Sequence, residues 1–149
     1  MTSPSTDRRF GVNSSVAIKA PCLAATTATI TLSGEQTVDG VALVTGDRCL
    51  VKNQSSGIDN GIYVVDTGLW TRDIDFDGSK DAVTGTLIRI VSGTVNGGGL
   101  FQVATTGTII VGTTSLSFTS TAVAGTVTTV SVATANGFSG AVANATSTP

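Results

Sequence analysis

The chain has 149 residues, a net charge of −2 and only 12% charged residues. A nucleic-acid partner is not expected, because binding phosphates requires a concentrated basic surface. The absence of histidine excludes a Ser-His-Asp triad, a Cys-His dyad and a His-ligated zinc site within one chain.

The apolar residues occur as short groups separated by Thr, Ser and Gly, and no run approaches the roughly 20 residues of a membrane helix. Membrane insertion is therefore not expected. Low charge with abundant Val, Thr and Gly favours a β-rich assembly protein over a lone enzyme. A carboxylate pair for glycan cleavage is conceivable among Asp39, Asp47, Asp59 and Asp66, but all lie in turns, where Asp is common. We expect no enzymatic activity and no cofactor.

The first residues form a polar segment without periodicity, and we predict an extended N-terminal arm over residues 1–19. Arg8, Arg9 and Phe10 are its one concentrated feature. Arginine beside an aromatic residue is typical of an interface anchor, so these three residues are candidates for docking to a partner. The alternative is a solvated, flexible terminus.

Strand signals follow within a predicted β domain over residues 20–121. Residues 28–32 alternate apolar and hydroxylated side chains, which predicts a half-buried strand. Turns are expected at residues 38–41 and 45–47, a short strand at 48–52 and a polar loop at 53–60.

Two hairpins are predicted next. Residues 61–65 and 69–72 are strands joined by residues 66–68, where the final glycine suggests a bulge with positive φ. Residues 86–91 and 100–104 flank the glycine-rich segment NGGG and form the second hairpin. Residues 108–111 and 115–118 are further strands, and a turn or two of helix is expected around residues 79–83. The spacing of turns predicts a mainly β fold, a small antiparallel β-sandwich or barrel with at most one short helix.

The two cysteines, Cys22 and Cys49, are expected to be unbridged and partly buried, because Cys49 lies inside a predicted strand. The extension over residues 122–149 contains GTVTTVSV (residues 125–132), which is uncharged. Such a strand is prone to aggregation when its edge is free, and copies of the same chain would cover it. We therefore expect this extension to pack around a symmetry axis.

Several short segments occur in a fixed order: TTATITLSG (26–34), VDGV (38–41), GDRCLVK (46–52), NGIYVV (60–65) and WTR (70–72). This series resembles a module of bacteriophage tail fibres and other minor virion structural proteins, over about residues 24–120. Residues 125–132, with ANGF (135–138) and VANA (142–145), resemble stretches that lead into the shafts of such fibres.

The resemblance implies a virion structural protein, located in the tail after assembly in the host cytoplasm, that forms a homotrimer and attaches to other virion proteins through its N-terminal part. The chain departs from the family pattern in two places: Leu100-Phe101 stand where many relatives carry tryptophan, and Cys49 stands where valine is usual. Relatives often continue far beyond this point. A head fibre or decoration protein is an alternative with the same trimer chemistry.

The segment WTRDIDFDGSKD (70–81) contains Asp73, Asp75 and Asp77 followed by glycine, as in the first half of a calcium loop. The bidentate glutamate expected later in such a loop is Thr84, and no entering helix is indicated. We therefore predict an ordinary loop without a metal, whose aspartates cap a short helix and pair with Arg72 or Lys80.

Trp70 and Tyr63 are expected to face each other across the first hairpin, with Arg72 on the same face as Trp70. The favoured interpretation is a core or interface anchor. The alternative is a platform on which a host-surface glycan stacks, in a carbohydrate-binding module.

Overall fold

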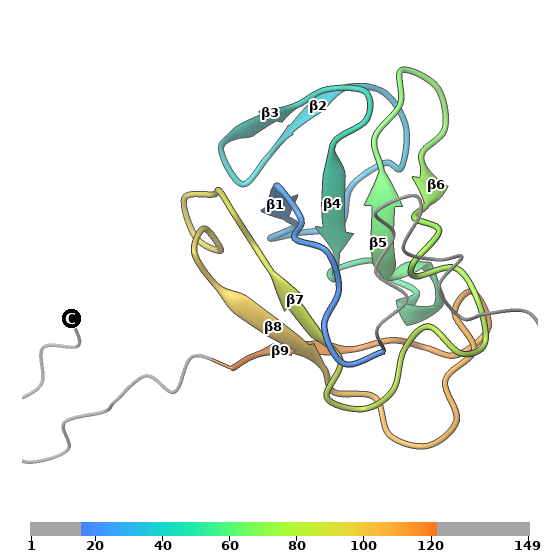
Figure 1. Cartoon of the computed structure of the whole chain (residues 1–149). Helices are drawn as coiled ribbons and strands as arrows, with labels where there is room; N and C mark the ends of the chain where they lie inside the picture. The colour runs from blue at the N-terminus through green and yellow to red at the C-terminus, as the bar shows by residue number, and fades with distance from the viewer. Residues whose placement is uncertain (1–15, 122–149) are drawn as a thin grey trace, which may run out of the picture.

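The computed structural model describes residues 16–121, which form three β-sheets (Figure 1). One sheet has four strands in the order β1 (Ala24–Ala25), β4 (Arg48–Val51), β5 (Gly61–Val64) and β6 (Thr71–Arg72). A hairpin joins β2 (Gln36–Val38) and β3 (Val41–Leu43). The third sheet orders β7 (Leu87–Arg89), β8 (Leu100–Val103) and β9 (Phe118–Ser120).

The fold is mainly β, as predicted. The helix within residues 16–121 is a single 3-10 turn, η2 (Gly57–Asp59). It lies in the segment predicted to be a polar loop. In this part of the chain, no helix has the length and apolar character needed to cross a membrane.

The four-stranded sheet is buried on both faces. Leu50 and Ile62 lie opposite each other on β4 and β5 and belong to one core cluster, whereas the neighbouring pair Cys49 and Tyr63 belongs to another. Adjacent strand residues point to opposite faces of a sheet, so both faces must be covered. This explains why β4 carries buried residues in succession rather than alternation.

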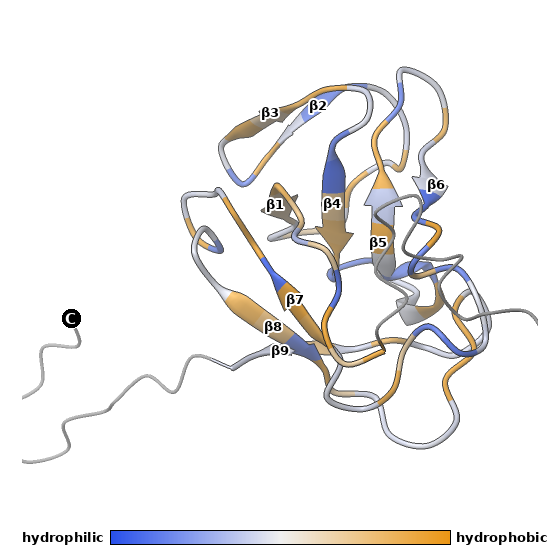
Figure 2. Cartoon of the chain, viewed as in Figure 1, coloured by the Kyte–Doolittle hydropathy of each residue, from blue (hydrophilic) through white to orange (hydrophobic). Residues whose placement is uncertain are grey.

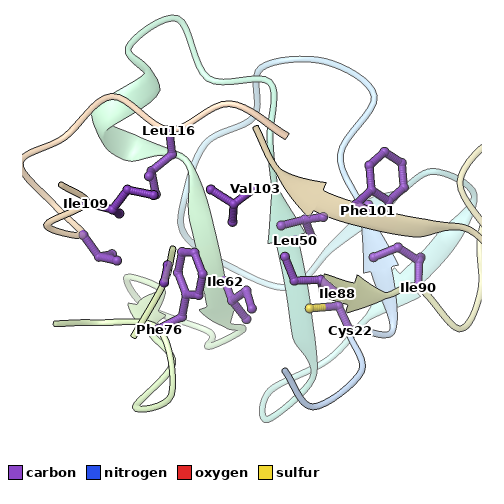
Figure 3. Packing of buried hydrophobic residues seen from close by; sticks show 13 residues of the cluster. Cys22, Leu50, Ile62, Phe76, Ile88, Ile90, Phe101, Val103, Ile109 and Leu116 are labelled. Carbon is purple, nitrogen blue, oxygen red and sulfur yellow. The ribbon is translucent and has the colours of Figure 1, made fainter. Parts of the chain in front are cut away.

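The first core lies between the four-stranded sheet and the sheet of β7, β8 and β9 (Figure 3). Figure 2 shows that β7 and β8 are each mostly hydrophobic, with one hydrophilic band, consistent with their place against this core. Phe76 is fully buried here, although it comes from the turn after β6 rather than from a strand. The buried members of the first core are Cys22, Ala25, Leu50, Ile62, Phe76, Ala82, Ile88, Ile90, Phe101, Val103, Ile109, Val111 and Leu116.

The second core lies between the other face of the four-stranded sheet and the β2–β3 hairpin. Val38 and Leu43 enter it from the hairpin, and Trp70 enters it from the segment before β6. The small hairpin therefore covers the second core. Packing against this core stabilises the hairpin, which would be marginally stable in isolation.

The turn between β2 and β3 is the one expected at residues 38–41. Asp39 has φ 51° and Gly40 has φ 79°, as in the two-residue turns that match the twist of paired strands. The Asp39 carbonyl accepts a hydrogen bond from Thr94 (2.9 Å). Its carboxylate accepts the N–H groups of Val95 (2.9 Å) and Asn96 (2.8 Å). Asp39 thus fixes the loop between β7 and β8 against the hairpin.

Replacing Asp39 with asparagine is expected to reduce the loss of folding stability that occurs when the pH is lowered. Desolvation opposes ionisation of Asp39, but the N–H donors of Asn96 and Val95 outweigh it and hold its pKa below the usual value. The ionised form therefore stabilises the fold above the unfolded pKa of about 3.9, and this contribution disappears as pH falls through the folded pKa. Thermal unfolding at about pH 6 and about pH 3 should show a smaller drop for Asp39→Asn than for the natural chain.

The exposed Asp77→Asn is the matched control for this measurement, since Asp77 lies outside the contact with the β7–β8 loop. An equal loss of stability on acidification in the natural chain and in Asp39→Asn would contradict the role given to this carboxylate.

The prediction of a strand at residues 28–32 is wrong. Both the N–H and the carbonyl of Ile30 bond to the side-chain amide of Gln54 (3.1 and 2.9 Å). A side chain therefore takes the place of a neighbouring strand. Further along, the Trp70 N–H donates to the Leu32 carbonyl (2.9 Å), and a single antiparallel bridge pairs Ser33 with Leu69.

Three further elements differ from expectation. Residues 108–111 form no strand, because the Ile110 carbonyl accepts the N–H groups of Thr113 and Thr114 in a turn. Residues 79–83 form no helix, because the Asp81 carboxylate accepts the N–H groups of Asp77 and Gly78 in a compact turn. The last strand is shifted, since β9 begins at Phe118.

Both predicted hairpins are confirmed as the antiparallel pairs β5–β6 and β7–β8. The reason given for the first turn is wrong. Gly68 does not adopt positive φ. Instead, the Asp66 carboxylate accepts the Gly68 N–H (2.7 Å), so aspartate shapes this turn.

Residues 16–19, placed in the arm by the sequence, lie beside β7. The Val16 carbonyl accepts the Thr86 hydroxyl (2.6 Å), and the Lys19 N–H donates to the Leu87 carbonyl (2.9 Å). Arg8, Arg9, Phe10 and the extension after residue 121 lie outside the described residues.

The two cysteines are free, as predicted, but they are fully buried rather than partly buried. Burial raises the pKa of Cys22 well above its ordinary value and raises the pKa of Cys49 to about 12. Both groups therefore act as small apolar side chains.

Candidate functional site

The acidic loop is a buried ion-pair site. The Arg48 guanidinium contacts the Asp73 carboxylate through Nη1 and both oxygens of Asp75 through Nη2 (3.1 Å each). Nη2 also donates to the Ala20 carbonyl (3.1 Å). The Asp75 side chain is only 2% exposed, so Arg48 is its main compensation for lost hydration.

The local turn explains how these carboxylates come together. The Asp73 carboxylate accepts the Asp75 N–H (3.2 Å), and its carbonyl accepts the Phe76 N–H (2.8 Å). This turn points two acidic side chains at Arg48 and sends the Phe76 ring into the first core. The loop thus links an ion-pair network to hydrophobic packing.

The predicted partners of these aspartates are wrong. Asp73 and Asp75 pair with Arg48 rather than with Arg72 or Lys80, and no helix follows for them to cap. No local signal identifies the partner, because Arg48 lies on β4, far away in the sequence. Figure 2 shows that β4 is hydrophilic at its start, where Arg48 lies, and hydrophobic along the rest of its length.

Lys19 adds a fourth charge to this network. It is buried, and its ammonium lies 6.0 Å from the centre of the Phe76 ring. Desolvation lowers the pKa of Lys19, while the negative charge of Asp75 opposes this shift. Desolvation raises the pKa of Asp75, and Arg48 opposes that shift. Lys19 thus places a second positive charge near the two carboxylates that Arg48 contacts.

The arrangement does not resemble a calcium loop. Asp73 and Asp75 point inward to Arg48, whereas Asp77 is exposed. Across residues 16–121, no cluster of three or more acidic, histidine or cysteine side chains is placed to hold a metal ion. The Arg48 guanidinium occupies the place between Asp73 and Asp75 that a bound metal ion would need, and it supplies their positive charge.

Trp70 is a core residue. It is 6% exposed, and its indole N–H donates to the Gly34 carbonyl (2.9 Å). This bond fastens the residues before β2 to the second core. A ring with so little exposed surface offers no face on which a sugar could stack. The alternative of Trp70 as a glycan platform is therefore wrong.

Tyr63 is also buried, and the register pairs it with Arg72 rather than with Trp70. The Arg72 guanidinium covers the Tyr63 ring at 4.9 Å and donates to the carbonyls of Asn60 (2.9 Å) and Ile58 (2.6 Å). The Tyr63 hydroxyl donates to the Asp59 carbonyl (2.8 Å). Both side chains therefore hold the loop around η2, and desolvation raises the pKa of Tyr63.

Three of the four carboxylates considered for catalysis accept backbone N–H groups of turns or loops. The Asp47 carboxylate accepts the Val44 N–H (2.9 Å), as Asp66 does for Gly68 and Asp39 for the β7–β8 loop. These are the turn roles expected of aspartate.

A cavity of about 490 Å³ lies beside the β7–β8 loop. The loop is held by Asn96, whose buried amide donates to the Ala25 carbonyl (3.1 Å). Sequence reasoning missed this residue, and the segment NGGG signalled only a turn. The cavity is lined by Val95, Asn96, Gly97, Gly98, Gly99, Phe101 and Ser120, none of which is ionisable.

Comparisons of this chain with protein-family models, curated proteins and solved structures found no match.

Proposed function

We propose that the chain is a structural protein of a bacteriophage virion. In this proposal it forms the virion-proximal part of a trimeric tail fibre or tail adaptor and attaches to the particle through its N-terminal arm. The arm would use Arg8, Arg9 and Phe10 for docking, and other tail proteins would be its partners.

The observation that best supports this proposal is the structural role of the motif residues. Arg48 of GDRCLVK forms the buried ion pairs, Tyr63 of NGIYVV lies under Arg72, and Trp70 of WTR fills the second core. The segments that carry the resemblance to tail-fibre modules thus build a scaffold. A scaffold of this kind suits an assembly protein better than a receptor pocket or a catalytic site.

The described surface also offers material for assembly. Leu69 is 79% exposed and Val95 is 74% exposed, and Ile74 is also largely exposed. Contact with other copies or with tail proteins would bury such side chains. Residues 125–132, which lie outside the described residues, are uncharged, and if they form the predicted strand they would add surface that needs the same protection.

Sedimentation of the full chain at micromolar concentration tests the oligomeric state. We expect a homotrimer, because three copies would cover the Val/Thr-rich extension. A chain that lacks residues 122–149 should sediment as a monomer, since the extension supplies the shared surface. A monomeric full chain would contradict the trimer.

A separate experiment tests docking through the arm. Deleting residues 1–15 should leave the folded domain intact, because its described contacts begin at Val16. The deleted chain should be missing from purified particles, and normal incorporation would contradict docking through Arg8, Arg9 and Phe10.

A further inference from the structure

The N-terminal segment of the domain runs parallel to β7. Ile18 pairs with Leu87 and Cys22 pairs with Ile90, both in parallel register. Four backbone hydrogen bonds of 2.8–2.9 Å join the two segments: Leu87 to Ala17, Lys19 to Leu87, Cys22 to Arg89 and Val91 to Cys22, donor first. Residues 17–22 thus behave as a further strand beside β7.

The last strand runs in the same direction. β8 is antiparallel to β7, and β9 is antiparallel to β8, so β9 points the way β7 does. Beyond the ends of β9, the Ala104 N–H donates to the Ser117 carbonyl and the Thr121 N–H donates to the Leu100 carbonyl (2.8 Å each). This ladder therefore extends over residues 117–121.

These directions place the two ends of the domain at opposite ends of one sheet. Val16 bonds Thr86, just before β7 begins. Thr121 bonds Leu100, where β8 begins, beside the end of β7. In Figure 1 the chain enters this sheet to the right of β7 and leaves β9 at the left.

Tension between the two ends would therefore act along the strands. Residues 17–22 would be pulled backward along β7, and β9 would be pulled forward along β8. In this shear geometry the hydrogen bonds of each ladder carry the force together. In the opening of a hairpin from one end, by contrast, the bonds break one after another. Forced unfolding is governed by the unfolding rate. Because several bonds must break together in shear, we expect a higher barrier in this geometry.

Buried side chains reinforce both outer strands. Lys19 and Cys22 are buried, so sliding residues 17–22 would move a charge and a core thiol. Phe118 of β9 packs on the first core, with its ring centre 6.2 Å from that of Phe76. Sliding either strand would break this packing as well as the backbone ladders.

We propose that residues 17–22 with β7, β8 and β9 form a mechanical clamp that keeps the domain folded under tension between its two ends. The source of the tension rests on the proposed function, in which one end is held by the particle and the other leads into a fibre. The clamp itself is a property of the single chain.

Optical-tweezers measurements on the full chain test the clamp by changing only the direction of pulling. One sample carries handles at the two termini and loads the ladders in shear. The other carries one handle at the C-terminus and one at the introduced thiol of Val95→Cys. Val95 lies in the β7–β8 loop, at the end of the sheet where β9 leaves, so this pair of handles opens β8–β9 from one end. Val95 is exposed, and the native thiols are buried away from the labelling reagent.

At equal loading rate, we expect the end-to-end unfolding force to exceed the force in the Val95 geometry by about twofold or more. Equal forces, or a lower end-to-end force, would overturn the clamp. The result is independent of the proposed function, because a single chain is pulled. A monomeric chain with the expected directional difference would retain the clamp and refute the trimer, whereas a trimer without the difference would do the reverse.

Discussion

Replacing Arg48 with methionine is expected to lower the free energy of unfolding by about 3–5 kcal/mol. Methionine keeps an apolar stem in place but removes the charge that compensates Asp73 and Asp75. Two carboxylates that lie in the interior would then lose the cation that contacts both of them, and Lys19, which forms no ion pair with either, would be the remaining positive charge nearby. The cost of this uncompensated burial dominates, because the Asp75 side chain is almost fully shielded from water.

Urea denaturation of Arg48→Met and of Arg89→Met measures this effect with a matched control. Arg89 is an exposed arginine on β7, and its replacement should change stability by no more than about 0.5 kcal/mol. Adding Asp75→Asn to Arg48→Met should restore part of the stability, since a neutral amide is less costly to bury. Equal effects of the two arginine replacements would contradict the ion-pair network.

Replacing Trp70 with alanine is expected to cost about 3–5 kcal/mol of stability. The change removes the largest side chain of the second core and the hydrogen bond from the indole to the Gly34 carbonyl. The neighbouring Leu69→Ala is the matched control, because Leu69 is largely exposed. Its effect should remain within about 0.5 kcal/mol.

This pair of variants also separates the core anchor from the glycan platform. A platform residue could be removed with loss of glycan binding and little loss of stability. If denaturant unfolding shows Trp70→Ala to be as stable as Leu69→Ala, the placement of the ring in the second core is contradicted.

The parts of the fold that could be predicted are those set by local signals. The β5–β6 and β7–β8 hairpins follow from alternating segments separated by a few turn residues, and the β2–β3 turn follows from Asp39-Gly40. In each case the partner strand is next in the chain, so its position requires no knowledge of tertiary structure.

The parts that could not be predicted depend on residues far apart in sequence. Gln54 supplies the side-chain amide that replaces a strand partner for Ile30, and Arg48 meets the acidic loop across the fold. The parallel pairing of β1 with β4 likewise has no local signature. Alternation alone predicted a strand at residues 28–32, because it does not reveal whether a neighbour is available.

The two buried cysteines have a consequence for where the protein can function. Neither thiol is bridged, and burial keeps both protonated and out of contact with solvent. Residues 16–121 therefore contain no disulfide that a reducing environment could break, and their thiols are shielded from an oxidising one. In the proposed role, a protein folded in the reducing interior of a cell would pass to the oxidising exterior with its cores unchanged.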